Sequence, residues 1–95
     1  MKFEEAAIKV KNDLKVKPAD EILLRLYGLY KQGTLGDCNI TCPGYFLMKT
    51  EPVYKWEAWN FHKGKLKEIA QKEYVMLVKQ LLVNNKTDDV KVSKK

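Results

Sequence analysis

Two tyrosines and a lysine stand at a spacing that would let them bind one ligand together. Tyr27, Tyr30 and Lys31 lie at i, i+3 and i+4, so on a helix they project from one side. Rings with hydroxyl groups at their edges can hold an aromatic base, and an ammonium can hold a phosphate. Spacing alone favours the alternative, in which the tyrosines are core residues and Lys31 only complements the helix dipole.

A second lysine with aromatic neighbours raises the same question. Tyr54 and Trp56 flank Lys55 in the sequence and would give a ligand an aromatic border. The simpler interpretation is that Trp56 and Trp59 are core residues and that Lys55 is solvated.

The residues typical of enzyme active sites are isolated. His62 is the only histidine, without a cysteine or aspartate at triad spacing, and we expect it to be an exposed surface residue. Cys38 and Cys42 lack the second half-site of a structural zinc centre, so we expect two free thiols in a loop. No glycine-rich phosphate loop follows a strand. The sequence therefore predicts no enzyme and no metal site.

Four segments with helical periodicity must position these side chains. The predicted helices cover approximately residues 2–14, 19–32, 51–63 and 66–83. Gly33 and Gly36 are expected to end the second helix, and Gly64 the third. Gly28 stands inside the second helix, where glycine costs about 1 kcal/mol relative to alanine. That cost indicates close approach by another backbone or by a ligand.

Length and composition indicate one small folded domain. The 95 residues are 45% hydrophobic and 32% charged, which excludes a wholly disordered chain and a doubly wound nucleotide-binding domain. No stretch approaches the roughly 18 apolar residues of a membrane-spanning helix. The acidic N-terminal residues do not form a secretory signal, which suggests the cytosol or the nucleus, although a mature secreted fragment would look the same. Of these compartments we expect the cytoplasmic one.

The charge is mildly basic. The net charge is +6, of which residues 1–85 carry +4. This balance suits an anionic partner, which is a nucleic acid, an anionic membrane surface or a phosphorylated small molecule. Simple solubility accounts for it equally well.

Several short sequence blocks follow one another in an order that is typical of a known protein family. They are Lys17-Pro18-Ala19-Asp20-Glu21, residues 26–39 (LYGLYKQGTLGDCN), Pro43-Gly44, residues 55–60 (KWEAWN) and Lys72-Glu73-Tyr74. Together these blocks resemble the signature of the acyl-CoA-binding protein family. Their order and approximate spacing agree with it from Phe3 to about Leu82.

The resemblance implies an all-α fold, a four-helix up-down-down-up bundle with a long loop between helices 2 and 3. It implies non-covalent binding of medium- to long-chain fatty acyl-CoA by an intracellular carrier and pool former, with no cofactor. The acyl-CoA-binding domain is expected to span residues 1–85, and residues 86–95 form a lysine-rich tail without an assigned function. We expect a monomer that neither binds nucleic acid nor inserts stably into membranes.

The resemblance also implies the site. In the family pattern Tyr27, Lys31 and Lys55 hold the CoA phosphates, Tyr30 flanks the adenine, and Tyr74 closes the site from the last helix. A family lysine near the end of the first helix aligns with Lys11 or Asn12. The implied head-group residues are Tyr27, Gly28, Leu29, Tyr30, Lys31, Lys55, Tyr74, Lys11 and Asn12. The implied acyl-chain residues are Phe3, Ala7, Val10, Leu23 and Leu24.

One stretch departs from the family pattern. The segment between Pro43 and Lys55 is about two residues longer than usual. Its residues Tyr45, Phe46, Leu47 and Met48 are too apolar for a free loop. We expect them to pack on the helices, either as a satellite core or as part of the acyl-chain groove.

Two other classes of function stand as alternatives. A basic helical nucleic-acid-binding module is disfavoured because the lysines are interspersed with acids and form no basic run. The second is a helical protein-interaction module with a vestigial ligand site.

Overall fold

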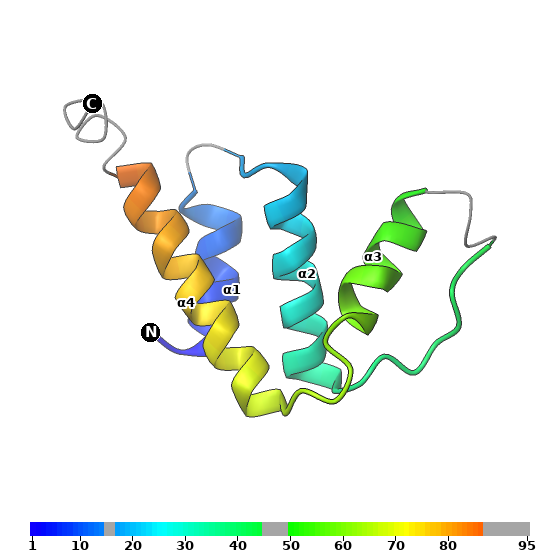
Figure 1. The fold of residues 1–95 in the computed structure, drawn as a ribbon. Helices are drawn as coiled ribbons and strands as arrows, with labels where there is room; N and C mark the ends of the chain where they lie inside the picture. Colours follow the sequence, from blue (N-terminus) through cyan, green and yellow to red (C-terminus); the bar gives the residue numbers. More distant parts are fainter. Residues whose placement is uncertain (15–16, 45–49, 87–95) are drawn as a thin grey trace.

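The computed structural model of the chain describes residues 1–14, 17–44 and 50–86, and these residues form four helices (Figure 1). They are α1 (Phe3–Asn12), α2 (Asp20–Leu35), α3 (Glu51–Asn60) and α4 (Lys67–Lys86). The apolar loop residues Tyr45, Phe46, Leu47 and Met48 and the tail residues 87–95 lie outside the described residues.

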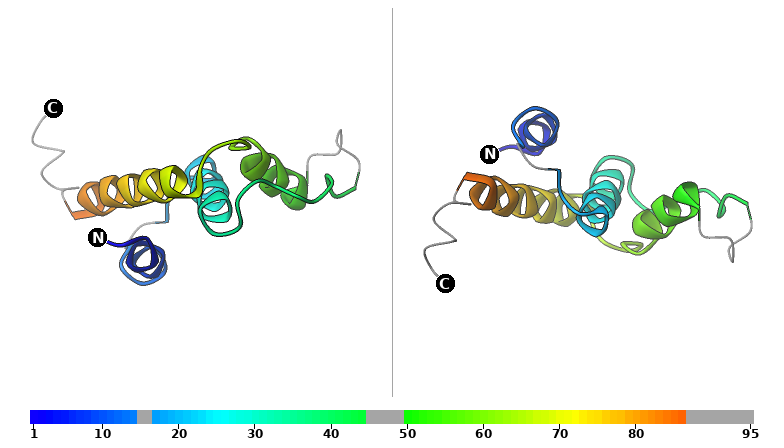
Figure 2. Two further views of the ribbon diagram at one scale, coloured as in Figure 1. Left: turned by 90° about the horizontal axis from the view of Figure 1, so that it is seen from below. Right: turned by 90° about the horizontal axis from the view of Figure 1, so that it is seen from above.

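The helices follow the predicted up-down-down-up topology. In Figure 1, α2 and α3 both begin at the upper end and descend, whereas α1 and α4 ascend. Helix α2 is central because it packs against both α3 and α4, and α1 packs against α4. Figure 2 shows α3 on the side of α2 away from α1.

The main core lies between α1, α2 and α4. The buried members share an apolar character and come from all three helices: Ala6, Leu26, Leu29, Ala70, Tyr74, Leu77 and Val78. Their burial removes apolar surface from water and is the main force that holds these helices together. Helix α3 contributes Val53 and Trp59, which are buried outside this cluster.

Helix α2 is longer than predicted, and the reason lies in its glycines. It continues to Leu35 and ends at Gly36, whose φ is 87°. Gly33 lies inside the helix, so the prediction that it ends the helix is wrong. A Cβ at Gly33 would lie 3.0 Å from Gln71 Cγ and 3.1 Å from Phe3 Cζ. This glycine therefore permits close packing of α2 against α1 and α4.

The end of α2 is tied to the turn between α3 and α4. The buried side chain of Gln32 donates from Nε2 to Asp37 Oδ1 at 2.9 Å and to the carbonyl of Lys65 at 2.7 Å. The amide of Gly64 donates to the same Asp37 oxygen at 2.8 Å. These two hydrogen bonds to the carboxylate lower the pKa of Asp37.

Candidate functional site

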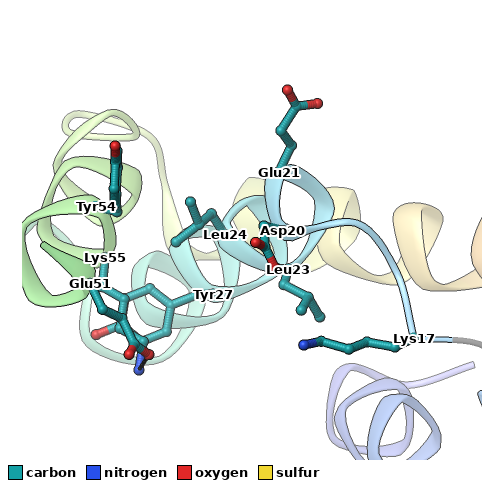
Figure 3. A pocket seen from close by; sticks show the side chains of 9 residues that line it. All are labelled: Lys17, Asp20, Glu21, Leu23, Leu24, Tyr27, Glu51, Tyr54 and Lys55. Atoms are coloured by element: carbon teal, nitrogen blue, oxygen red, sulfur yellow. Dashed lines mark ion pairs between the residues drawn. The ribbon is translucent and has the colours of Figure 1, made fainter. Parts of the chain in front are cut away.

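A cavity opens between the first halves of α2 and α3 (Figure 3). Its volume is about 760 Å³, within the range of small-molecule sites. Leucines, tyrosines and charged side chains line it: Lys17, Asp20, Glu21, Leu23, Leu24, Tyr27, Glu51, Tyr54 and Lys55. The apolar part comes from α2, and the tyrosines stand on both helices.

Two lysines lie over one tyrosine ring at the α3 side of this cavity. Lys31 Nζ lies 5.8 Å from the centroid of the Tyr27 ring and 5.2 Å from that of Trp59. Lys55 Nζ lies 5.5 Å from the Tyr27 centroid. Both ammonium groups are thus held by cation–π contact at a ring that lines the cavity. The arrangement presents two positive charges to an anionic group.

A carboxylate shares this charged region. Glu51 Oε2 lies 3.2 Å from Lys55 Nζ, one helical turn away along α3. Glu51 is largely exposed and Lys55 is half-buried, so the pair is partly screened by solvent and contributes little to stability. An anion that approached Lys55 would also meet this carboxylate.

A second hollow of about 400 Å³ adjoins the cavity and shares three of its residues, Tyr27, Glu51 and Lys55. Two indole hydrogen bonds shape its other wall. Trp56 Nε1 donates to the carbonyl of Ile40, and Trp59 Nε1 donates to the carbonyl of Gly36, each at 2.8 Å. Both bonds fasten the start of the long loop to α3. Of the two tryptophans predicted to be core residues, Trp59 is buried and Trp56 is half-buried.

Gly28 and Leu29 have packing roles. A Cβ at Gly28 would lie 2.2 Å from the carbonyl oxygen of Ala58, so only glycine lets α2 and α3 approach this closely. Of the two predicted reasons for a glycine here, the structure shows the approach of another backbone. Leu29 is buried in the main core. Neither residue lines the cavity, and their assignment to the head-group site stays a prediction.

Tyr30 and Tyr74 lie on the other side of α2, in a cluster with Phe3. The ring centroids are 5.5 Å apart for Phe3 and Tyr30, 5.2 Å for Phe3 and Tyr74, and 5.8 Å for Tyr30 and Tyr74. Tyr74 is buried, and its burial, with Tyr30 beside it, raises the pKa of its hydroxyl. Tyr30 keeps an exposed face. The structure does not bring these two tyrosines into the cavity that holds Tyr27.

The predicted acyl-chain residues also divide into two groups. Leu23 and Leu24 line the cavity. Phe3, Ala7 and Val10 instead pack against the main core from α1. The five residues therefore do not form one continuous groove in this structure.

Four residues that line the cavity were not predicted for the site from the sequence: Lys17, Asp20, Glu21 and Glu51. Figure 3 shows Lys17 reaching toward Leu23 from the segment before α2. Lys11 and Asn12, the predicted contacts near the end of α1, are exposed and do not line the cavity. A signal for Glu51 exists, because it lies four residues before Lys55 on the same helical face. Lys17 carries no such signal, since it precedes the helix.

His62 is not the exposed residue that the sequence indicated. It is 8% exposed, and its ring lies 3.2 Å from where a Cβ at Gly28 would stand. Its Nδ1 lies 3.2 Å from Lys65 Nζ, and Lys65 also forms an ion pair with Glu73. Burial, with Lys65 nearby, lowers the pKa of His62. The prediction was wrong because the close approach of α2 and α3 covers His62, which lies two residues after the end of α3.

The two cysteines are free, as predicted, with Cys38 buried and Cys42 half-buried. Within residues 1–14, 17–44 and 50–86, no group of three histidine, cysteine, aspartate or glutamate side chains could hold a metal ion. None of the helices in the described part of the chain is long and apolar enough to cross a membrane.

The fold and the site define a small all-α binding protein. Its site places lysine ammonium groups over the Tyr27 ring, beside leucine side chains, and this combination suits an anionic ligand that also has an apolar part. The family model for acyl CoA binding protein matches residues 1–78. The chain belongs to the acyl-CoA-binding protein family, which is a family of binding proteins and not of enzymes. The resemblance and the four-helix fold predicted from the sequence are thereby confirmed.

Individual relatives agree with this assignment. The chain is 54% identical over 80 residues to the acyl-CoA-binding protein of Saccharomyces cerevisiae, covering 84% of this chain and 88% of that protein. It is 54% identical over 79 residues to the acyl-CoA-binding protein of Dictyostelium discoideum, covering 83% and 90%.

Solved structures agree as well. The crystal structure of Oryza sativa acyl-CoA-binding protein 2 matches with a TM-score of 0.77 at 45% identity, covering 86% of each chain. The solution structure of acyl coenzyme A binding protein from yeast matches with a TM-score of 0.66 at 51% identity, covering 87% of this chain and 93% of that one.

Proposed function

We propose that the protein binds medium- to long-chain fatty acyl-CoA esters non-covalently and acts as a cytoplasmic carrier and pool former for them. The observation that carries the proposal is the pair of ammonium groups, Lys31 and Lys55, over the Tyr27 ring at the edge of a leucine-lined cavity. An acyl-CoA carries several phosphate charges at one end and an apolar chain at the other. The site offers a partner for each.

The head group binds at the charged edge. Lys31 and Lys55 contact the phosphates, and a charge-assisted contact of this kind contributes about 1.5–3 kcal/mol. The Tyr27 ring holds both lysines in place and its hydroxyl adds a further donor. Tyr30, Tyr74, Gly28 and Leu29 belong to the head-group site by family pattern, with Tyr30 offering its exposed face.

The acyl chain binds along Leu23 and Leu24 toward Tyr54. Each buried CH₂ contributes about 0.8 kcal/mol, so affinity rises with chain length until the cavity is full. Phe3, Ala7 and Val10, which are partly buried on α1, belong to the acyl-chain site by family pattern. The protein binds as a monomer and has no nucleic-acid partner.

Titration calorimetry with palmitoyl-CoA, free CoA and duplex DNA tests the proposal. The expected result is tight binding of palmitoyl-CoA, weaker binding of free CoA and none of DNA, with an affinity that falls as salt rises. Absence of palmitoyl-CoA binding by the folded protein would leave a helical interaction module with a vestigial site. Binding of DNA alone would point to a nucleic-acid-binding module.

A further inference from the structure

Tyr54 faces Leu24 across the cavity, beside the point where α2 and α3 approach each other closely. The two helices run in the same direction, and at Gly28 a Cβ would lie 2.2 Å from the carbonyl oxygen of Ala58. Leu24 precedes Gly28 by four residues, and Tyr54 precedes Ala58 by four, so each lies one turn back on the same helical face. Both side chains line the cavity. They therefore form opposite walls of it, directly next to the contact between the helices.

The contact at Gly28 closes the cavity in one direction. The carbonyl oxygen of Ala58 occupies the space where a Cβ would stand, so no methylene group can pass between the helices there. One turn away from this contact, the side chains of Leu24 and Tyr54 line an open cavity. A hydrocarbon chain in this part of the site therefore lies between these two side chains.

The opposite end of the cavity is charged. Three lining residues there come from the segment before α2 and from its first residues, and all three are exposed: Lys17, Asp20 and Glu21. Figure 3 shows Lys17 and Tyr54 at opposite sides of the cavity. A hydrocarbon end against these groups would remove water from charged side chains, which is unfavourable. The apolar end of a ligand is thus directed toward Tyr54 and away from Lys17.

The ring of Tyr54 still has apolar surface to bury. Tyr54 is 44% exposed although it lines the cavity, and Leu23 and Leu24 are half-buried. In Figure 3 the hydroxyl of Tyr54 points away from Lys55 and Glu51, which stand at the charged edge of the site. A tyrosine placed in this way can cover a hydrocarbon with its ring while its hydroxyl remains in water.

We infer that Tyr54 is a specificity residue that favours long-chain over shorter acyl-CoA esters, an inference that rests on the proposed function. The chain of a short ester ends beside Leu23 and Leu24, whereas the last carbons of a longer chain cover the ring of Tyr54. Each additional CH₂ that leaves water raises affinity about fourfold. The ring thereby extends the chain length over which affinity continues to rise.

Titration calorimetry of the full chain with octanoyl-CoA, palmitoyl-CoA and free CoA tests the inference. Tyr54→Ala is expected to weaken palmitoyl-CoA binding about tenfold, because one large apolar contact is lost. Binding of octanoyl-CoA and of free CoA should stay as in the wild type. Tyr54→Gln should behave as Tyr54→Ala does, since an amide gains nothing from contact with a hydrocarbon. Tyr54→Phe keeps the ring and should bind all three ligands as the wild type does.

Phe61→Ala is the matched control, because Phe61 directly follows α3, is 81% exposed and lies outside the cavity. It should leave all three affinities unchanged, and circular dichroism checks that each variant is folded. The inference is overturned if Tyr54→Ala loses equal affinity for octanoyl-CoA and palmitoyl-CoA, which would assign the ring to the head-group site. It is also overturned if palmitoyl-CoA binding does not fall. A wild type that binds none of the three ligands would instead refute the proposed function, and the inference with it.

Discussion

Two aromatic clusters flank α2, and they differ in what surrounds their rings. Between α1, α2 and α4, Phe3, Tyr30 and Tyr74 contact one another ring to ring. Between α2 and α3, Tyr27 contacts two ammonium groups and borders a cavity. The first cluster is a packing unit, and the second presents charge to solvent.

The comparison shows that two tyrosines of the same helix, α2, contact different neighbouring helices. Tyr27 and Tyr30 are three residues apart, and this spacing predicts that they project from one side of the helix. In the structure their rings contact different helices, because α4 and α3 pack on neighbouring faces of α2. In this structure Tyr30 packs against Phe3 and Tyr74, whereas Tyr27 lines the cavity. Substitutions in the two clusters should therefore affect stability and binding to different extents.

The largest expected effect is on stability, from Tyr74→Ala. The variant removes a buried ring from the packing cluster and leaves a cavity, so it should lower the free energy of unfolding by about 3–5 kcal/mol. Urea denaturation followed by circular dichroism measures this.

Tyr74→Phe is the matched control, because it keeps the ring and removes only the hydroxyl. It should cost less than about 1.5 kcal/mol of stability. If Tyr74→Phe leaves stability intact but weakens palmitoyl-CoA binding tenfold, the hydroxyl of Tyr74 contacts the head group, as the family pattern implies. Unchanged binding would make Tyr74 a packing residue only.

The next effect is on binding, from Lys31→Ala. Lys31 lies over the rings of Tyr27 and Trp59 at the charged edge of the site. Loss of its phosphate contact, worth about 1.5–3 kcal/mol, should weaken palmitoyl-CoA binding about tenfold or more. The melting temperature should change little, since Lys31 is only half-buried. Calorimetry gives the affinity.

Lys79→Ala is the control for this change, because Lys79 is an exposed lysine on α4, outside the cavity. It should leave affinity unchanged. Equal losses in Lys31→Ala and Lys79→Ala would mean that only the net charge matters, and Lys31 would then not be a phosphate contact.

A smaller effect, of opposite sign, is expected from Glu51→Gln. The carboxylate lies 3.2 Å from Lys55 Nζ and repels a phosphorylated ligand at the same place. Removing an exposed charge of this kind changes the interaction by about 0.5–1 kcal/mol, so affinity should rise about two- to fivefold, less at high salt.

Glu68→Gln makes the same change of charge on α4, away from the cavity, and should not affect affinity. Weaker binding by Glu51→Gln would show that Glu51 orients Lys55 for the ligand and does not compete with it.

Periodicity in the sequence predicts the helices and most of the core, because a helix buries whichever face is apolar. It fails where two helices approach closely. Gly33 reads as a helix end but permits packing against Phe3, and His62 reads as a surface residue but is covered as α2 meets α3. Local spacing also could not find Lys17, which reaches the cavity from outside any helix. The positions of these residues depend on how the helices pack against one another, and the periodicity of a single helix cannot predict that.

The smallest expected effect is a pH dependence of the free energy of unfolding that arises from His62. This residue is buried where α2 and α3 approach each other at Gly28. Burial and Lys65 lower its pKa in the folded state, whereas Glu73 opposes and Arg25 adds to the shift. In the unfolded chain a histidine titrates near 6.5. As the pH falls, His62 takes up a proton more readily in the unfolded chain than in the folded protein. The free energy of unfolding therefore falls as pH decreases from about 7.5 to about 5.5.

His62→Leu should lack this decline, because leucine fills the buried position without titrating. The window avoids the carboxylates, since Glu5 and Asp37 have lowered pKa values and lose their stabilising charge only in more acidic solution. Urea titrations at several pH values in that window measure the slope for both proteins. Parallel slopes would assign the decline to other groups and would make His62 only a packing residue between α2 and α3.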